Sequence, residues 1–162
     1  MWRSARRFAV PFVVGAVVVG VSVSATERPK PKCKKISGTL TSRLSTRACA
    51  SPVGICTTGE FKGDRLLNGR TTFVADSLQQ AGATEEPSTL VYSGLLTIQT
   101  KHGTLTTRDT GILDTASGLV AARDVVVGGT GIFAGGTGYL LFQGTGTSTF
   151  VNEARGELCL QR

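Results

Sequence analysis

Residues 88–113 read STLVYSGLLTIQTKHGTLTTRDTGIL, and apolar and polar residues alternate on both sides of a short Lys-His-Gly connection. Alternation with a period of two gives a β-strand one apolar face and one polar face. A connection of this length typically joins antiparallel neighbours. The stretch therefore predicts two paired strands, and the apolar face of the first carries Leu90, Tyr92, Leu96 and Ile98.

The same alternation recurs along most of the chain. Eight short antiparallel strands in an open sheet would leave two exposed edges, and closure of the sheet removes both. We predict an all-β domain that forms a closed eight-stranded antiparallel barrel, with a two-sheet sandwich as the alternative. The expected strands are 36–44, 54–61, 69–78, 88–100, 103–113, 121–128, 137–150 and 153–160.

The N-terminus has the pattern of a signal peptide, expected to form a helix. Three arginines precede an uncharged stretch from Phe8 to Val21, and Val23-Ser24-Ala25 offers small residues before a polar segment. We predict cleavage after Ala25 and secretion of the mature protein. The alternative is an uncleaved helix that anchors the protein in a membrane. The expected organisation is a signal peptide (1–25), a basic spacer rich in Pro and Lys (26–35) and the barrel domain (36–162).

The net charge of +7 comes from the N-terminal part of the chain. Three arginines lie in the leader and five Lys or Arg lie in residues 26–35, whereas ten basic and ten acidic residues follow from Ile36 onward. A nucleic-acid-binding domain carries a basic surface, so the neutral barrel domain argues against a nucleic-acid partner. We interpret the basic spacer as a solvated linker, with peripheral contact to an anionic surface as the alternative.

The four cysteines suit an oxidising compartment. In an up-and-down barrel with an even number of strands, the start of the first strand lies beside the end of the last. Cys33 and Cys159 occupy these two places, so we predict a disulfide between them and a second between Cys49 and Cys56. There is no CxxC pair and His102 is the single histidine, so no metal site is expected.

A glycine-rich segment carries a family resemblance. Residues 125–142 read VVVGGTGIFAGGTGYLLF, which resembles the glycine motif of the allene oxide cyclase/dirigent-like barrel family. Residues 154–160 are similar to the last strand of that family, and the segment that begins at Cys49 resembles secreted bacterial members. The resemblance extends from Ile36 to the C-terminus. It implies an eight-stranded barrel whose central cavity positions a hydrophobic substrate for cyclisation or guides radical coupling.

Asp109 is the main candidate for chemistry. Strict alternation places it on the face of Leu105 and Leu113, which should point into the barrel. A carboxylate there must be hydrogen-bonded, paired or protonated. The structural interpretation pairs Asp109 with Arg123 or a threonine hydroxyl and predicts that Asp109→Ala lowers stability. The functional interpretation makes Asp109 a general acid/base or a ligand anchor with a perturbed pKa.

Tyr92 and Tyr139 are candidates to line the same cavity as Asp109, and His102 is expected to be solvated in a hairpin turn. No nucleophile motif is present, and the loose GxGxxA at Gly129 is not followed by a helical pattern, so no cofactor is expected. The sequence predicts a secreted barrel that binds a small hydrophobic ligand in its lumen. The alternative is an isomerase, cyclase or dirigent-like protein that acts on a hydrophobic substrate.

Overall fold

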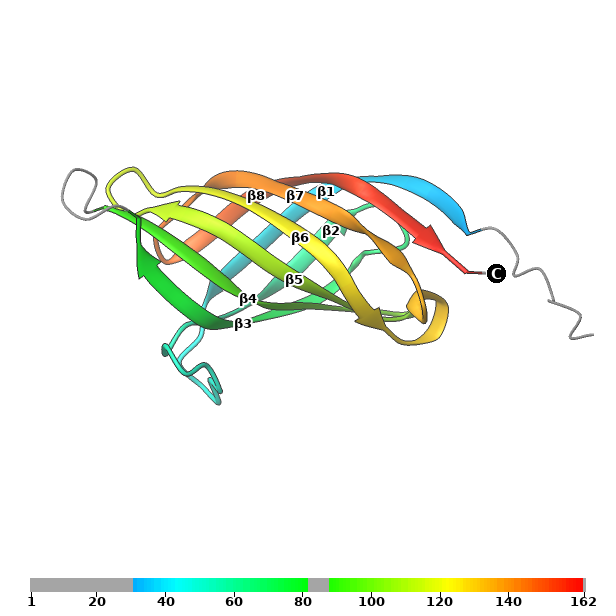
Figure 1. Cartoon of the computed structure of the whole chain (residues 1–162), viewed down its shortest axis with the longest axis horizontal. Coiled ribbons are helices and arrows are strands. Elements are labelled where there is room, and N and C mark those ends of the chain that lie inside the picture. Colours follow the sequence, from blue (N-terminus) through cyan, green and yellow to red (C-terminus); the bar gives the residue numbers. More distant parts are fainter. Residues whose placement is uncertain (1–30, 82–87, 162) are drawn as a thin grey trace, which may run out of the picture.

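A computed structural model describes residues 31–81 and 88–161, which form a closed eight-stranded antiparallel barrel (Figure 1). Each strand pairs with the next in sequence, and β8 pairs with β1 to close the barrel. The predicted barrel is therefore confirmed, and the sandwich is not formed. The strands are β1 (Lys32–Leu44), β2 (Cys56–Gly63), β3 (Gly69–Gln80), β4 (Thr89–Thr100), β5 (Gly103–Asp114), β6 (Leu119–Gly129), β7 (Thr137–Gly146) and β8 (Thr149–Leu160).

The predicted signal helix and its cleavage site lie outside the described residues. Within them, the one helical element is a short 3-10 helix at Gly131–Phe133, and no helix has the length and apolar character needed to cross a membrane. The other irregular segments are the connections between strands.

The largest differences from the predicted strand boundaries are at the start of β1 and at the turn between β7 and β8. β1 begins at Lys32 because Lys32–Lys35 pair with the last residues of β8, so part of the expected spacer belongs to the barrel. The predicted strand 137–150 contains the whole of β7, the turn after it and the first residues of β8, since β7 ends at Gly146 and β8 begins at Thr149. A two-residue turn preserves the alternation of inward and outward residues, so the pattern runs through it without a break.

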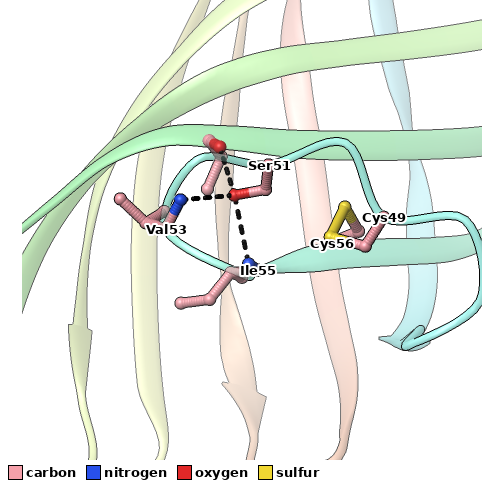
Figure 2. The surroundings of a disulfide bond; sticks show 6 residues. Cys49, Ser51, Val53, Ile55 and Cys56 are labelled. Carbon is pink, nitrogen blue, oxygen red and sulfur yellow. Dashed lines mark hydrogen bonds between the residues drawn. A yellow bond between two sulfur atoms is a disulfide. The ribbon is translucent and has the colours of Figure 1, made fainter.

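Both predicted disulfides are present. Cys33 and Cys159 lie directly opposite each other on β1 and β8, where their bridge closes the seam of the barrel. Cys49 and Cys56 are bridged across the loop between β1 and β2 (Figure 2). The two bonds fix the two places where the chain enters and leaves the first strand.

Ser51 organises the β1–β2 loop beside the second disulfide (Figure 2). Its hydroxyl donates a hydrogen bond to the backbone carbonyl of Ala75 on β3 and accepts bonds from the backbone N–H groups of Val53 and Ile55 at 3.2 and 3.1 Å. A single side chain thus satisfies three backbone groups and ties the loop to the barrel wall. The loop thereby carries Ile55 to the rim of the barrel.

The two ends of the barrel differ. At the end where β1 begins and β8 ends, which the C-terminus marks in Figure 1, fully buried Leu67 and Phe133 come from the β2–β3 and β6–β7 connections and pack into the core. We call this the plugged end. The distal end carries the β1–β2, β5–β6 and β7–β8 connections. Ligand access is therefore expected from the distal end.

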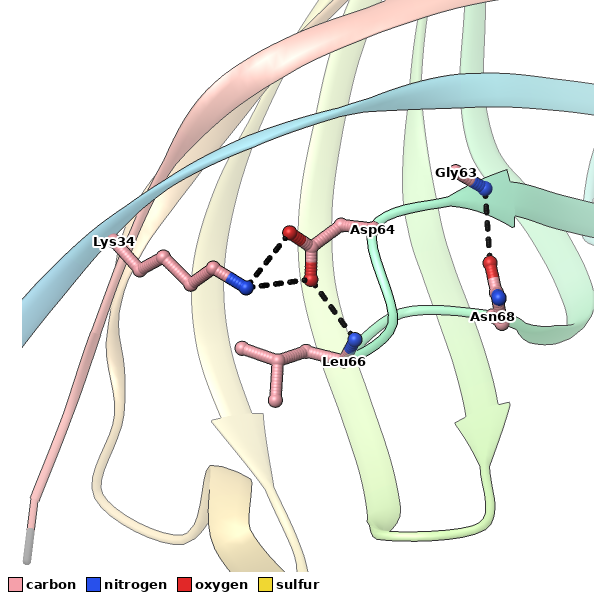
Figure 3. A network of polar contacts seen from close by, with 5 residues as sticks. All are labelled: Lys34, Gly63, Asp64, Leu66 and Asn68. Atoms are coloured by element: carbon pink, nitrogen blue, oxygen red, sulfur yellow. Dashed lines mark hydrogen bonds and ion pairs between the residues drawn. The ribbon is translucent and has the colours of Figure 1, made fainter.

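Polar contacts fix the connection that supplies Leu67 (Figure 3). The Asp64 carboxylate accepts a hydrogen bond from the backbone N–H of Leu66 at 2.9 Å and forms an ion pair with Lys34 Nζ on β1, also at 2.9 Å. Asn68 Oδ1 accepts a hydrogen bond from the backbone N–H of Gly63 at 2.8 Å. These bonds hold a tight turn against β1, so that Leu67 is directed into the barrel.

Candidate functional site

A cavity of about 220 Å³ occupies the half of the barrel away from the plug. We call it the lumen cavity. Side chains from the distal ends of the strands and from their loops supply most of its wall, and this wall is mainly apolar. Such a lining favours a ligand that buries an apolar body. Representative lining residues are Leu44, Ile55, Leu78, Leu90, Leu113 and Phe150.

A few polar side chains interrupt the apolar wall. Asp109 on β5 lines the cavity and is 8% exposed, and Ser42 on β1 and Asn152 on β8 line it from other strands while remaining buried. Tyr92 on β4 and two threonines, Thr57 and Thr147, add hydroxyl groups to this wall. Few polar groups in an apolar cavity are the usual arrangement of a small-molecule site, in which they fix the orientation of the ligand.

Asp109 has a second carboxyl group beside it. Asp124 on β6 is its direct cross-strand partner, points into the barrel like Asp109 and is fully buried. The Thr107 hydroxyl donates a hydrogen bond to Asp124 Oδ2. Asp109 Oδ1 and Asp124 Oδ1 have no hydrogen-bond partner among the described residues. Buried polar atoms are rarely left unpaired in proteins, so this pair marks an unusual site.

The expected partners of Asp109 are engaged elsewhere. Arg123 lies over the ring of Tyr139, 5.5 Å from its centroid, and both side chains are on the outer face of the barrel. The Thr107 hydroxyl bonds to Asp124 and not to Asp109. Neither Arg123 nor the Thr107 hydroxyl therefore pairs with Asp109 among the described residues. The other neighbouring arginine, Arg108, pairs with Asp76 outside the barrel.

Burial sets the protonation of the two carboxyl groups. Desolvation raises the pKa of Asp109, and the negative charge of Asp124 raises it further. Desolvation also raises the pKa of Asp124, against the opposing effect of the hydrogen bond from Thr107. The pair consequently retains protons at pH values at which an exposed aspartate is ionised. A carboxyl group held neutral in an apolar cavity can donate a proton, and after losing that proton it can bind a cation.

Tyr92 packs beside this pair. Its ring makes an edge-to-face contact with Phe73, with the ring centroids 5.8 Å apart. Burial raises the pKa of the Tyr92 hydroxyl, and the charges of Asp109 and Asp124 raise it further, so this group stays a neutral phenol. Tyr92 and Asp109 line the same cavity.

Tyr139 does not belong to the lumen cavity. It lies on β7 between the inward residues Gly138 and Leu140, and its side chain is exposed on the outer face. The sequence around it is apolar on both faces of the strand, so alternation could not decide its direction. His102 lies in the β4–β5 turn at the plugged end and is half-buried, away from the cavity.

Asp124, Asn152 and Ser42 are site residues that the sequence analysis did not single out. Asp124 precedes Val125-Val126-Val127, an apolar run that hides which face of the strand points inward. Its pairing with Asp109 also depends on the register that the β5–β6 turn sets, which runs without a shift from Leu113 opposite Val120 to Thr107 opposite Val126. The available signal was the charge of Asp124 within an expected strand, which alone does not place it beside Asp109.

Gly111 provides the space that Tyr92 occupies. The two residues are cross-strand partners, and a Cβ added at Gly111 would lie 2.6 Å from the Tyr92 hydroxyl oxygen and 2.8 Å from Ala122 Cβ. We expect Gly111→Ala to lower the free energy of unfolding by about 1–3 kcal/mol, because overpacking forces Tyr92 to move. Chemical denaturation measures this change. At Gly128, an added Cβ meets no atom within 4 Å, so Gly128→Ala is the matched control. Equal losses in the two variants would contradict the prediction.

Metal binding has little support in the described part of the chain. The group there with suitable ligand spacing is Cys33, Glu157 and Cys159, and its two sulfur atoms form the disulfide of the barrel seam. Sulfur in a disulfide is not the thiolate that binds a metal ion. The lumen cavity, with Asp109 in its wall and Asp124 beside Asp109, remains the candidate site.

Comparison of the chain with protein-family models, with curated proteins and with solved structures finds no match. The class of protein is thus defined by the fold and the site alone: an all-β barrel with a plugged end, an apolar lumen cavity and a pair of buried carboxyl groups.

Proposed function

We propose that this protein is a secreted barrel that binds a small, mainly apolar ligand in the lumen cavity. The observation that carries the proposal is Asp109 Oδ1, which is buried without a hydrogen-bond partner in the wall of an apolar cavity. An unpaired buried oxygen is costly, by about 1–3 kcal/mol, and a ligand with a complementary group removes that cost. We therefore propose Asp109 as the residue that anchors the ligand and Tyr92 as part of the cavity wall.

The size of the cavity limits the ligand. A dry protein cavity of about 150 Å³ is enough to bind benzene. A cavity of about 220 Å³ accordingly suits a ligand of about eight to ten non-hydrogen atoms. This is the size of a small cyclic or branched compound with one polar group.

Several features support the proposed compartment and family. The two disulfides are compatible with an extracytoplasmic location, and the leader has the pattern of a signal peptide. A closed eight-stranded barrel is the fold that the resemblance to allene oxide cyclase and dirigent-like proteins implies. We propose membership of that family, and a solvated role for the basic residues before the barrel.

The alternative function is an isomerase or cyclase that acts on a hydrophobic substrate. The raised pKa of Asp109 favours it, because a carboxyl group that stays protonated near neutral pH can act as a general acid inside an apolar cavity. Turnover would then require Asp109 as a carboxyl group, whereas binding alone requires the cavity. Assays of bound compounds for isomerised products separate the two functions.

Ligand binding is tested by titration with cyclohexanemethanol, monitored through the methyl signals of the protein. We expect saturable shifts at Leu90 and Leu113, which line the cavity, and none at Leu141 on the outer face. Leu90→Trp should fill the cavity and weaken binding by about tenfold or more, because the probe then loses its apolar contacts. Leu141→Trp is the control for the added ring. Shifts confined to the outer face would contradict the proposal.

A further inference from the structure

We propose that the ligand of the lumen cavity is a small apolar amine, bound as its ammonium cation against Asp109 with Asp124 behind it. This inference rests on the proposed function, since it requires that the cavity binds a ligand. It assigns the chemical class of the polar group: a positively charged hydrogen-bond donor on an apolar body.

The first argument is the charge within the barrel. Asp109 and Asp124 face inward from adjacent strands, and the described residues that line the cavity include no Lys, Arg or His. The arginines that precede them in sequence, Arg108 and Arg123, point outward and contact Asp76 and Tyr139. Two buried acidic groups with no basic partner are complemented by a cation that comes from outside the chain.

The second argument is the hydrogen-bonding capacity of the unpaired atoms. Asp109 Oδ1 and Asp124 Oδ1 are both carboxyl oxygens, and the Thr107 hydroxyl already bonds to the other oxygen of Asp124. The carboxyl pair thus has two unpaired acceptor oxygens and lacks donors to fill them. A primary ammonium group has three N–H donors and no acceptor, so it matches this deficit.

The third argument excludes other polar groups. A ligand carboxylate would place a third acidic group beside two that are already hard to ionise. A ligand carbonyl can accept a hydrogen bond from the protonated form of Asp109, from a hydroxyl such as that of Tyr92 or Ser42, or from the Asn152 amide, but it leaves the negative form of the carboxyl pair without a counter-ion. The other strands that face Asp109 across the cavity present no titratable side chain apart from Tyr92 on β4.

Proton exchange distinguishes an amine from a carbonyl compound. Near neutral pH the free amine is already an ammonium ion, and its binding stabilises the carboxylate form of Asp109, so a proton leaves the protein. Binding of the amine should therefore strengthen as the pH rises from about 5 to about 8. Binding of a ketone to the protonated carboxyl group should weaken over the same interval.

The experiment uses three probes with the same apolar body: cyclohexylmethylamine, cyclohexanemethanol and cyclohexyl methyl ketone. Calorimetric titration near neutral pH, in two buffers with different ionisation enthalpies, gives both the affinity and the number of protons released. We expect the amine to bind about tenfold or more tightly than the alcohol and the ketone, with release of up to one proton. Asp109→Asn should remove this preference and the proton release, whereas the alcohol still binds.

Glu153→Gln is the matched control, since it makes the same change from carboxyl to amide at an exposed side chain on the outer face. It should preserve the preference for the amine. If the alcohol or the ketone binds as tightly as the amine, or if the amine binds without proton release, the inference is wrong and the proposed function stands. If none of the three probes binds, the proposed function fails as well. The pH dependence in the parent protein provides a test that does not depend on the folding of the variant.

Discussion

Replacing Cys33 and Cys159 with alanine should lower the free energy of unfolding by about 5 kcal/mol, on the chain-entropy account of disulfides. The bridge joins residues 126 positions apart, so its loss frees almost the whole barrel in the unfolded state. The bridge also lies where β1 pairs with β8. A barrel that loses the β1–β8 pairing becomes an open sheet with two edges. Chemical denaturation of the oxidised protein measures the loss.

The second disulfide is the matched control for this prediction. Cys49 and Cys56 are 7 positions apart, so replacing both with alanine should lower the free energy of unfolding by about 2–3 kcal/mol on the same account. The difference follows from loop length, because a longer loop gains more entropy when its cross-link is removed. Equal losses in the two double variants would show that the seam is held by β1–β8 pairing alone.

Alternation was sufficient to predict the barrel because the strands have one apolar face and one polar face. It placed Asp109 inward together with Leu105 and Leu113, and the structure confirms this position. It also located the ends of the first and last strands well enough to predict the Cys33–Cys159 bridge. These features depend on the period of two in each strand and on the order of the strands, both of which a sequence displays.

The errors have a common physical cause. Alternation gives no information where both faces are apolar, as around Tyr139, or where a two-residue turn preserves the pattern, as after Gly146. Register is also hidden, since it depends on turn geometry, as at the β5–β6 turn. The candidate site depends on register, because Asp109 and Asp124 become a pair only when β5 and β6 are aligned.

Asp109→Asn should make the stability of the protein less sensitive to pH and should raise stability on the alkaline side. The pKa of Asp109 is raised in the folded state, whereas in the unfolded chain it is about 4. Between that value and the raised one, the folded state binds more protons than the unfolded state, so the free energy of unfolding falls as the pH rises. The contribution is fully present below about pH 4 and is lost as the pH passes through the raised pKa.

We expect this loss to reach about 2–4 kcal/mol in the parent protein between about pH 4 and about pH 8, and the asparagine variant to lack the part due to Asp109. The variant should therefore unfold at a higher denaturant concentration than the parent near pH 8 and at a similar or lower one near pH 5. Glu153→Gln, on the exposed outer face, should leave the pH dependence of the parent unchanged. If Asp109→Asn instead destabilises the protein near pH 8, the Asp109 carboxylate must be stabilised by donors within the barrel, and the case for a ligand cation at this site is lost.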